Sequence, residues 1–303
     1  METIVIALGG NALLNPSGRQ SYAEGQRNMA RVARSIVSIA RGHRVVVTHG
    51  NGTQVGDELV RNISSKGEID PLPLYAMTAE TQGTIGSEIA LALGREARLR
   101  GIGMRVGCVL THVVVSPRDP SFSRPAKPIG PTMALGELKR YRMGGMGIAK
   151  SKGGYRLTVA SPRPREILEL DAIRDLSRSG IVVACGGGGV PVVRRGSSLQ
   201  GAAAVIDKDS TTRLLANSLG AGTMLILTDA GYVYADYPKN KWAITEMPAS
   251  SMKRFADRFE AGSIRPKVEA AVEFVENGGK EARIGNLFEL DGIMKGRSGT
   301  RVY

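Results

Sequence analysis

Short apolar runs alternate with helix-like periodicity along almost the whole chain. Residues 4–8 form an apolar run typical of a buried strand, and further on Met29, Val32, Ile36 and Ile39 fall on one helical face. The same alternation predicts strands at 45–47, 105–115, 181–184 and 224–228, and helices at 80–99, 167–179, 210–219 and 267–275. This order is typical of an α/β protein in which helices cover both faces of a mostly parallel sheet.

One long segment departs from this pattern. Residues 116–160 are rich in proline, glycine and arginine and carry no clear period. We interpret this segment as an irregular excursion out of the sheet and refer to it as the flap.

Glycine-rich loops follow four of the strand-like runs. In open α/β sheets, ligands collect at the carboxyl ends of the strands, which is where these loops are expected. Four such loops together favour a binding site over simple tight turns. Their sequences are ALGGNALL (7–14), THGNGTQVG (48–56), ACGGGGVPVV (184–193) and LTDAGYVY (227–234).

Composition places the chain among globular proteins, with 42% hydrophobic and 23% charged residues in a length of 303. No apolar run reaches the length of a membrane span, and the early first strand leaves no room for a signal peptide, so we expect a cytoplasmic protein. Cys108 and Cys185 lie in apolar runs and are expected to be buried, reduced thiols. The three histidines are scattered, which predicts no protein-built metal site.

The net charge of +13 raises the possibility of an anionic partner. Residues 138–165 contain eight cations and no acid. Such a patch is compatible with a solvated flap, with attraction of small anions, or with nucleic-acid binding. Aromatic residues make up only 5% of the chain, and no RNA-binding or helix-turn-helix motif is present, so we expect no nucleic-acid partner.

The glycine loops match neither of the two common phosphate-binding motifs. No G-x-x-x-x-G-K-[ST] sequence occurs, and HGNGTQVG has one residue too many between its second and third glycines to be G-x-G-x-x-G. A dinucleotide site keeps weak support from Glu68 and Asp70, which fall near the position of a ribose-binding acid.

Three lysines stand in unusual settings. Lys208 lies between two aspartates in AVIDKDSTT, just before a predicted helix, and Lys267 follows Pro266 at the start of another. Lys127 lies between prolines in the flap sequence RPAKPIGP. The aspartates beside Lys208 could simply cap the helix. They could also hold the ammonium group in place while the helix N-terminus attracts phosphate.

Several motifs, taken in order, resemble those of the carbamate kinases, which are members of the amino acid kinase family. They are ALGGNALL, VVVTHGNGTQVG, KPIGP, ACGGGGVPVV, AVIDKD, LTDAGYVY, GSIRPKVEAAVEFVENGGK and KGRSGT. The resemblance covers essentially all of residues 3–302 and implies a three-layer αβα sandwich with a protruding subdomain formed by the flap. It also implies a homodimer, with substrate bound by the N-terminal half of a single domain and nucleotide by residues 165–303.

The resemblance implies reversible phosphoryl transfer from ATP to carbamate, giving ADP and carbamoyl phosphate, with Mg²⁺ carried on the nucleotide. Lys127 would reach the substrate from the flap, and Asp209 would orient the other two lysines. The residues implied to surround the substrate are Gly9, Gly10, Asn11, Gly50, Asn51 and Gly52. Those implied to border the nucleotide are Lys208, Thr228, Asp229, Tyr234, Pro266 and Lys267. His49 is expected to be structural rather than catalytic.

Two residues depart from the family pattern beside these motifs. Thr53 stands where proline is usual, and Arg265 stands where a small residue is usual and would add a cation near the phosphates. These changes leave open a kinase of another small carboxylate or phosphonate on the same fold. A non-catalytic nucleotide-binding or nucleic-acid-binding protein is a third possibility, which the presence of all three lysines disfavours.

Overall fold

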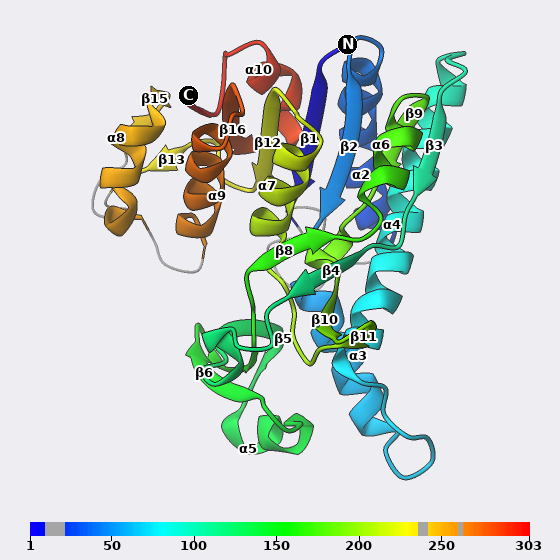
Figure 1. The fold of residues 1–303 in the computed structure, drawn as a ribbon, viewed down its shortest axis with the longest axis vertical. Coiled ribbons are helices and arrows are strands. Elements are labelled where there is room, and N and C mark those ends of the chain that lie inside the picture. The colour runs from blue at the N-terminus through cyan, green and yellow to red at the C-terminus, as the bar shows by residue number, and fades with distance from the viewer. Residues whose placement is uncertain (10–21, 236–241, 260–262) are drawn as a thin grey trace.

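The computed structural model describes residues 1–9, 22–235, 242–259 and 263–303. Its centre is an eight-stranded sheet in the order β15-β17-β16-β12-β1-β2-β9-β3 (Figure 1). The strands from β16 to β3 all run parallel, and β17 pairs antiparallel with β16. The mostly parallel sheet that the sequence predicts is therefore confirmed. The strands are β1 (Thr3–Leu8), β2 (Arg44–His49), β3 (Arg105–Cys108), β9 (Gly180–Val183), β12 (Thr223–Thr228), β15 (Glu246–Met247), β16 (Glu281–Asn286) and β17 (Thr300–Val302).

Helices cover both faces of this sheet, as the alternation of side chains along each strand requires. Ile4, Ile6 and Leu8 of β1 pack into the core beneath α2 (Tyr22–Ala40), α4 (Leu74–Leu99) and α10 (Leu290–Met294). Val5 points to the other core. That core lies beneath α6 (Leu170–Ser177), α7 (Lys208–Ser218), α8 (Ala249–Arg254) and α9 (Arg265–Glu276). The result is the three-layer αβα sandwich.

A second sheet of four strands lies beyond the carboxyl ends of the central strands (Figure 1). Its strands are β4 (His112–Val115), β8 (Pro164–Ile167), β10 (Val190–Arg195) and β11 (Ser198–Gly201). The single strand expected at 105–115 is therefore wrong, because β3 belongs to the first sheet and β4 to the second. The chain breaks at Thr111, whose backbone N–H donates to Gln82 Oε1 (2.7 Å) and whose carbonyl accepts from Gln82 Nε2 (3.3 Å). The glutamine side chain of α4 thus bonds the backbone between the two strands, and the Thr111 carbonyl also accepts from the backbone N–H of Val190 in β10 (2.8 Å).

The flap has its own secondary structure, so its interpretation as irregular chain is wrong. It contains the antiparallel sheet β5-β7-β6, made of β5 (Lys127–Met133), β7 (Gly154–Val159) and β6 (Gly147–Ser151), with the short helix α5 (Leu135–Leu138). Its apolar side chains include Ile129 and Leu157, which pack with Val55 and Leu59 of α3 (Gly52–Ser64). The flap projects from the end of the sheet (Figure 1) and is fixed to the body by this small third core.

The remaining elements are short. Strands β13 (Val233–Tyr234) and β14 (Ala243–Ile244) form a two-stranded ribbon. The 3₁₀ turns are η1 (Pro120–Phe122), η2 (Lys139–Tyr141), η3 (Gly186–Gly188), η4 (Ala256–Arg258) and η5 (Leu287–Glu289). No helix within the described residues is long and apolar enough to cross a membrane.

Three further expectations change in detail. Helix α4 begins at Leu74 instead of residue 80, and α3 begins inside the glycine loop HGNGTQVG, where the sequence suggested only a loop. Of the two thiols expected to be buried, Cys185 is buried, but Cys108 is exposed because β3 is the edge strand of the sheet. Burial raises the pKa of the Cys185 thiol, and the partial burial of the Cys108 thiol raises its pKa as well.

The flap and the body meet backbone to backbone at two glycines. A Cβ atom on Gly56 of α3 would lie 2.0 Å from the Cα atom of Gly130 in β5. Gly130 also has a φ of +67°, a conformation that side chains disfavour. Arg156 of β7 adds a hydrogen bond from its Nε to the Gly130 carbonyl (2.9 Å). These contacts set the distance between β5, which carries Lys127, and the helix beneath it.

We expect Gly56→Ala to lower the free energy of unfolding by about 1–3 kcal/mol, because the added methyl must push two backbones apart. Gly136→Ala in α5 is the matched control, since a Cβ there meets nothing within 4 Å. It should leave stability unchanged or raise it by up to about 1 kcal/mol. Urea unfolding measures both, and equal stabilities for the two variants would contradict the close contact.

Candidate active site

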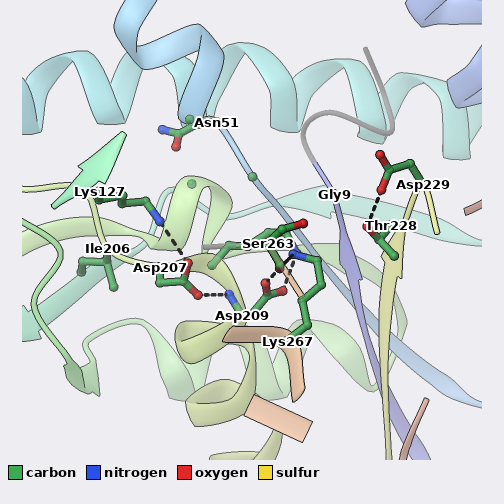
Figure 2. Close-up of a pocket in the computed structure, with 14 residues that line it drawn as sticks. Gly9, Asn51, Lys127, Ile206, Asp207, Asp209, Thr228, Asp229, Ser263 and Lys267 are labelled. Carbon is green, nitrogen blue, oxygen red and sulfur yellow. Dashed lines mark hydrogen bonds and ion pairs between the residues drawn. The ribbon is translucent and has the colours of Figure 1, made fainter. Parts of the chain in front are cut away.

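The carboxyl ends of β1, β2 and β12 open into one cavity of about 220 Å³ (Figure 2). Helices α3, α7 and α9 begin at or beside it, so three positive helix ends face the same space. Such an arrangement attracts anions before any side chain is considered. The lining residues are Gly9, Gly50, Asn51, Gly52, Lys127, Gly187, Ile206, Asp207, Lys208, Asp209, Thr228, Asp229, Ser263 and Lys267.

Asp209 is a buried carboxylate shared by two lysines. Its Oδ1 is ion-paired with Lys208, and its Oδ2 lies 3.2 Å from the Nζ of Lys267 (Figure 2). Only 2% of Asp209 is exposed, and burial by itself would raise the pKa of its carboxyl group. The two ammonium groups outweigh burial and hold that pKa below its ordinary value. The carboxylate is therefore ionised and fixes both lysines.

The two lysines respond differently to this shared partner. Burial lowers the pKa of Lys208, and Asp209 offsets only part of that effect. Asp209 raises the pKa of Lys267, mainly through charge attraction. Lys267 also donates to the carbonyl of Ser263 (3.2 Å). Two cations of unequal basicity thus stand side by side at the start of α7 and α9.

Asp207 connects the flap to α7. As the N-cap of this helix, it accepts hydrogen bonds at Oδ1 from the backbone amides of Asp209 (2.9 Å) and Ser210 (3.2 Å). Its Oδ2 lies 3.0 Å from the Nζ of Lys127, which reaches the cavity from β5 (Figure 2). Burial favours the protonated acid, but Lys127 outweighs it and lowers the pKa of Asp207.

The glycines at the end of β2 leave backbone donors facing the cavity. Asn51 is the N-cap of α3 but makes no side-chain hydrogen bond to that helix, and its Nδ2 donates instead to Thr81 Oγ1 (2.9 Å). Gly187, with φ of +64°, packs against the Asn51 side chain, since a Cβ there would lie 2.3 Å from Nδ2. The first-turn amides of α3 therefore remain available to an anion.

His49 lies beneath the cavity and does not line it. Its ring is fully buried, with Nδ1 3.1 Å from the Gly50 carbonyl and Nε2 without a hydrogen-bond partner in the described part of the chain. A Cβ on Gly186 would lie 2.2 Å from that Nε2. Burial lowers the pKa of His49 to about 4, so the ring is neutral at pH 7. This environment accords with the structural role expected for it.

The opposite wall of the cavity is formed by the end of β12. Thr228 donates from Oγ1 to Asp229 Oδ1 (2.9 Å), and Asn286 Nδ2 holds the Asp229 carbonyl (2.9 Å). Within the residues that the structure describes, no group of three or more histidine, cysteine or acidic side chains could hold a metal ion.

Most of the residues implied by the sequence come together at this cavity. Gly10 and Asn11 lie outside the described residues, whereas Tyr234 in β13 and Pro266 in the first turn of α9 do not line the cavity. The implied residues that line it are Gly9, Gly50, Asn51, Gly52, Lys127, Lys208, Asp209, Thr228, Asp229 and Lys267.

Some residues that line the cavity were not expected from the sequence. Gly187, Ile206, Asp207 and Ser263 line the cavity but were not among the expected site residues. Asp207 could have been found from its place as a helix cap next to Lys208.

The residues that suggested a dinucleotide site or a different substrate lie outside the cavity lining. Glu68 and Asp70 are in the α3–α4 connection and do not line the cavity. Arg265 does not line it either, because it contacts Asp257 through a hydrogen bond to that residue's carbonyl (3.0 Å). Thr53 lies in the first turn of α3, also outside the lining.

Comparison with known proteins gives full-length similarity. Residues 2–286 match the amino acid kinase family. The chain is 41% identical to a carbamate kinase of Escherichia coli over 305 residues and 38% identical to one of Pyrococcus horikoshii over 318 residues, with 99% of each chain covered in both cases. The structure of carbamate kinase from Giardia lamblia bound to AMP-PNP superposes with a TM-score of 0.91 at 34% identity, covering 99% of this chain and 98% of that one.

The neutral, buried His49 makes a prediction for stability against pH. The pKa of His49 falls from 6.5 in the unfolded chain to about 4 in the folded protein, so the unfolded chain binds the proton more readily. The free energy of unfolding therefore has its full value above pH 6.5 and decreases as the pH falls toward 4. We expect the unfolding free energy of the wild type to drop by about 3 kcal/mol more than that of His49→Gln over this range. Urea unfolding between pH 7.5 and 4 measures the difference, and parallel curves would contradict it.

Proposed function

The chain belongs to the amino acid kinase family and, within it, to the carbamate kinases, so we propose that the cavity described above transfers a phosphoryl group reversibly between ATP and carbamate. The products are ADP and carbamoyl phosphate. The observation that carries the proposal is the convergence of Lys127, Lys208 and Lys267, from three distant segments, on one cavity bordered by three helix N-termini.

The chemistry requires charge compensation more than proton transfer. A carbamate oxygen is already anionic, so no general base is needed to activate it. The main cost is to bring this anion against a triphosphate, and preorganised cations and amide donors reduce that cost. His49 is buried away from the cavity and neutral, which agrees with a reaction that needs no base.

The two sides of the cavity divide the substrates between them. Lys127 would contact the carbamate or its phosphoryl group from the flap. The segment 50–52 and Gly9 would surround this small anion, and we place Gly10 and Asn11 with them by family resemblance.

Lys208 and Lys267 would contact the nucleotide phosphates, oriented by Asp209. Thr228 and Asp229 would border the nucleotide from the end of β12. By family resemblance, we place Tyr234 and Pro266 farther along the same nucleotide, which agrees with their positions outside the cavity lining.

The donor set fits a Mg²⁺ ion that is held mainly by the nucleotide. Both oxygens of Asp209 are ion-paired with lysines, and those of Asp207 accept bonds from Lys127 and two amides. Among the described cavity residues, Asp229 is then the carboxylate with an oxygen open to a cation, since only its Oδ1 accepts from Thr228. Bound there, Mg²⁺ would neutralise phosphate charge, and most of its ligands would be phosphate and water oxygens.

The position of the two departures from the family pattern supports carbamate as the acceptor. Thr53 and Arg265 could have altered the substrate if their side chains lined the cavity. Neither lines it, and Arg265 is held by Asp257. The described residues that line the cavity therefore include neither departure.

We further propose a homodimer through the edge of the large sheet. Among the residues that the structure describes, strand β3 has a partner strand only on its β9 side, and the adjoining α4 exposes Leu91 and Leu99 (66% and 72%). An open strand edge beside exposed leucines favours pairing with a second copy. Light scattering should give twice the chain mass for the wild type and the single mass for Leu91→Asp, with Leu199→Asp on β11 as control. A monomeric wild type would rule out this assembly.

ATP formation from ADP and carbamoyl phosphate with Mg²⁺ tests the catalytic proposal. Removal of one preorganised charge should lower kcat by about 10²–10³-fold in Lys208→Ala. Lys253→Ala is the matched control, because this exposed lysine of α8 pairs with Glu276 outside the cavity and should leave the rate unchanged. An unimpaired Lys208→Ala enzyme would contradict the lysine mechanism, and an inactive wild type would contradict carbamate as the acceptor.

A further inference from the structure

One carboxylate links the flap to α7, the helix that begins with Lys208. Asp207 places Oδ1 at the N-terminus of α7 and Oδ2 against Lys127, which is 80 residues away in the chain. Figure 2 shows the Lys127 ammonium group pointing at the Asp207 carboxylate. The two oxygens have separate partners, so the residue is at once a helix cap and a tether for the flap.

The tether continues into the other two lysines. Asp207 directly precedes Lys208 in the chain. Lys208 is ion-paired with Asp209, and Asp209 is also ion-paired with Lys267. All three ammonium groups are therefore positioned against the same helix end. The flap lysine alone would otherwise lie on a separate structural unit, since β5 belongs to the small flap sheet.

A lysine that no other side chain holds in place is poorly suited to catalysis. Its four-carbon side chain loses rotamer entropy when the ammonium group is fixed. If the substrate had to order Lys127, part of its binding energy would be spent on that step. A carboxylate already in place removes this cost, because the lysine is ordered before the substrate enters.

We propose that Asp207 is a positioning residue that holds Lys127 over the cavity for the incoming carbamate or carbamoyl phosphate. The inference rests on the proposed function of this site. Asp207 acts through the lysine and does not contact the reacting atoms. The substrate anion meets an ammonium group that is already placed, and joins Asp207 as its second partner.

A double-mutant cycle separates this role from simple helix capping. Asp207→Asn keeps the cap, because asparagine is an equally good N-cap, but removes the charge that holds Lys127. We expect kcat/KM for carbamoyl phosphate to fall about tenfold or more, mainly through KM, while the KM for ADP stays within about twofold. In the Lys127→Ala background, the same substitution should cause no further loss.

Control variants keep the outcome interpretable. Asp207→Ser retains a capping hydroxyl but cannot reach Lys127, and it should reproduce the kinetics of Asp207→Asn with an unchanged melting temperature. Asp171→Asn, at an exposed acid in the first turn of α6, should leave the kinetics unchanged.

The two proposals fail in different ways. Equal losses from Asp207→Asn in both backgrounds would overturn the tether, because a structural defect adds independently to the loss of the lysine. A wild-type rate in Asp207→Asn would overturn it as well. A wild-type rate in Lys127→Ala would instead contradict the assignment of that lysine under the proposed function.

Discussion

Three ammonium groups can share one small cavity only because one buried and one half-buried carboxylate stand between them. Asp209 accepts from Lys208 and Lys267, and Asp207 accepts from Lys127, so each positive charge has a negative partner before a ligand binds. Without those partners, charge repulsion and the loss of hydration would drive the lysines apart or neutralise them. The loops, helix ends and flap all serve to hold this alternating set of charges at the end of the sheet.

Local patterns in the sequence were sufficient for much of this arrangement. Apolar runs and helical periodicity identify most of the large sheet and its covering helices, because a buried strand and an amphipathic helix each carry their own period. The glycine loops and the three lysines are also local signals. Their convergence follows from topology, since parallel strands bring their carboxyl ends to one edge.

Features that depend on distant contacts could not be found in this way. The break between β3 and β4 lies where Thr111 bonds Gln82 of α4, and apolar periodicity in residues 105–115 cannot reveal that distant contact. Cys108 lies in an apolar run but on an edge strand, and edges are a property of sheet order. The flap appeared irregular because its short strands pair with one another over turns and pack on α3. The sequence suggested Asp207 only as a cap or as a partner of the adjacent Lys208, because Lys127 lies 80 residues away.

The contact of Gly56 with Gly130 has a consequence for how this fold can diversify. Because the flap touches α3 through main-chain atoms at this point, its distance from the cavity does not depend on its outward-facing side chains. Natural variation or laboratory grafting can therefore exchange the outward-facing residues of the flap while the reach of its lysine is retained. The two glycines act as a fixed joint, and substrate preference can evolve around it without a new architecture.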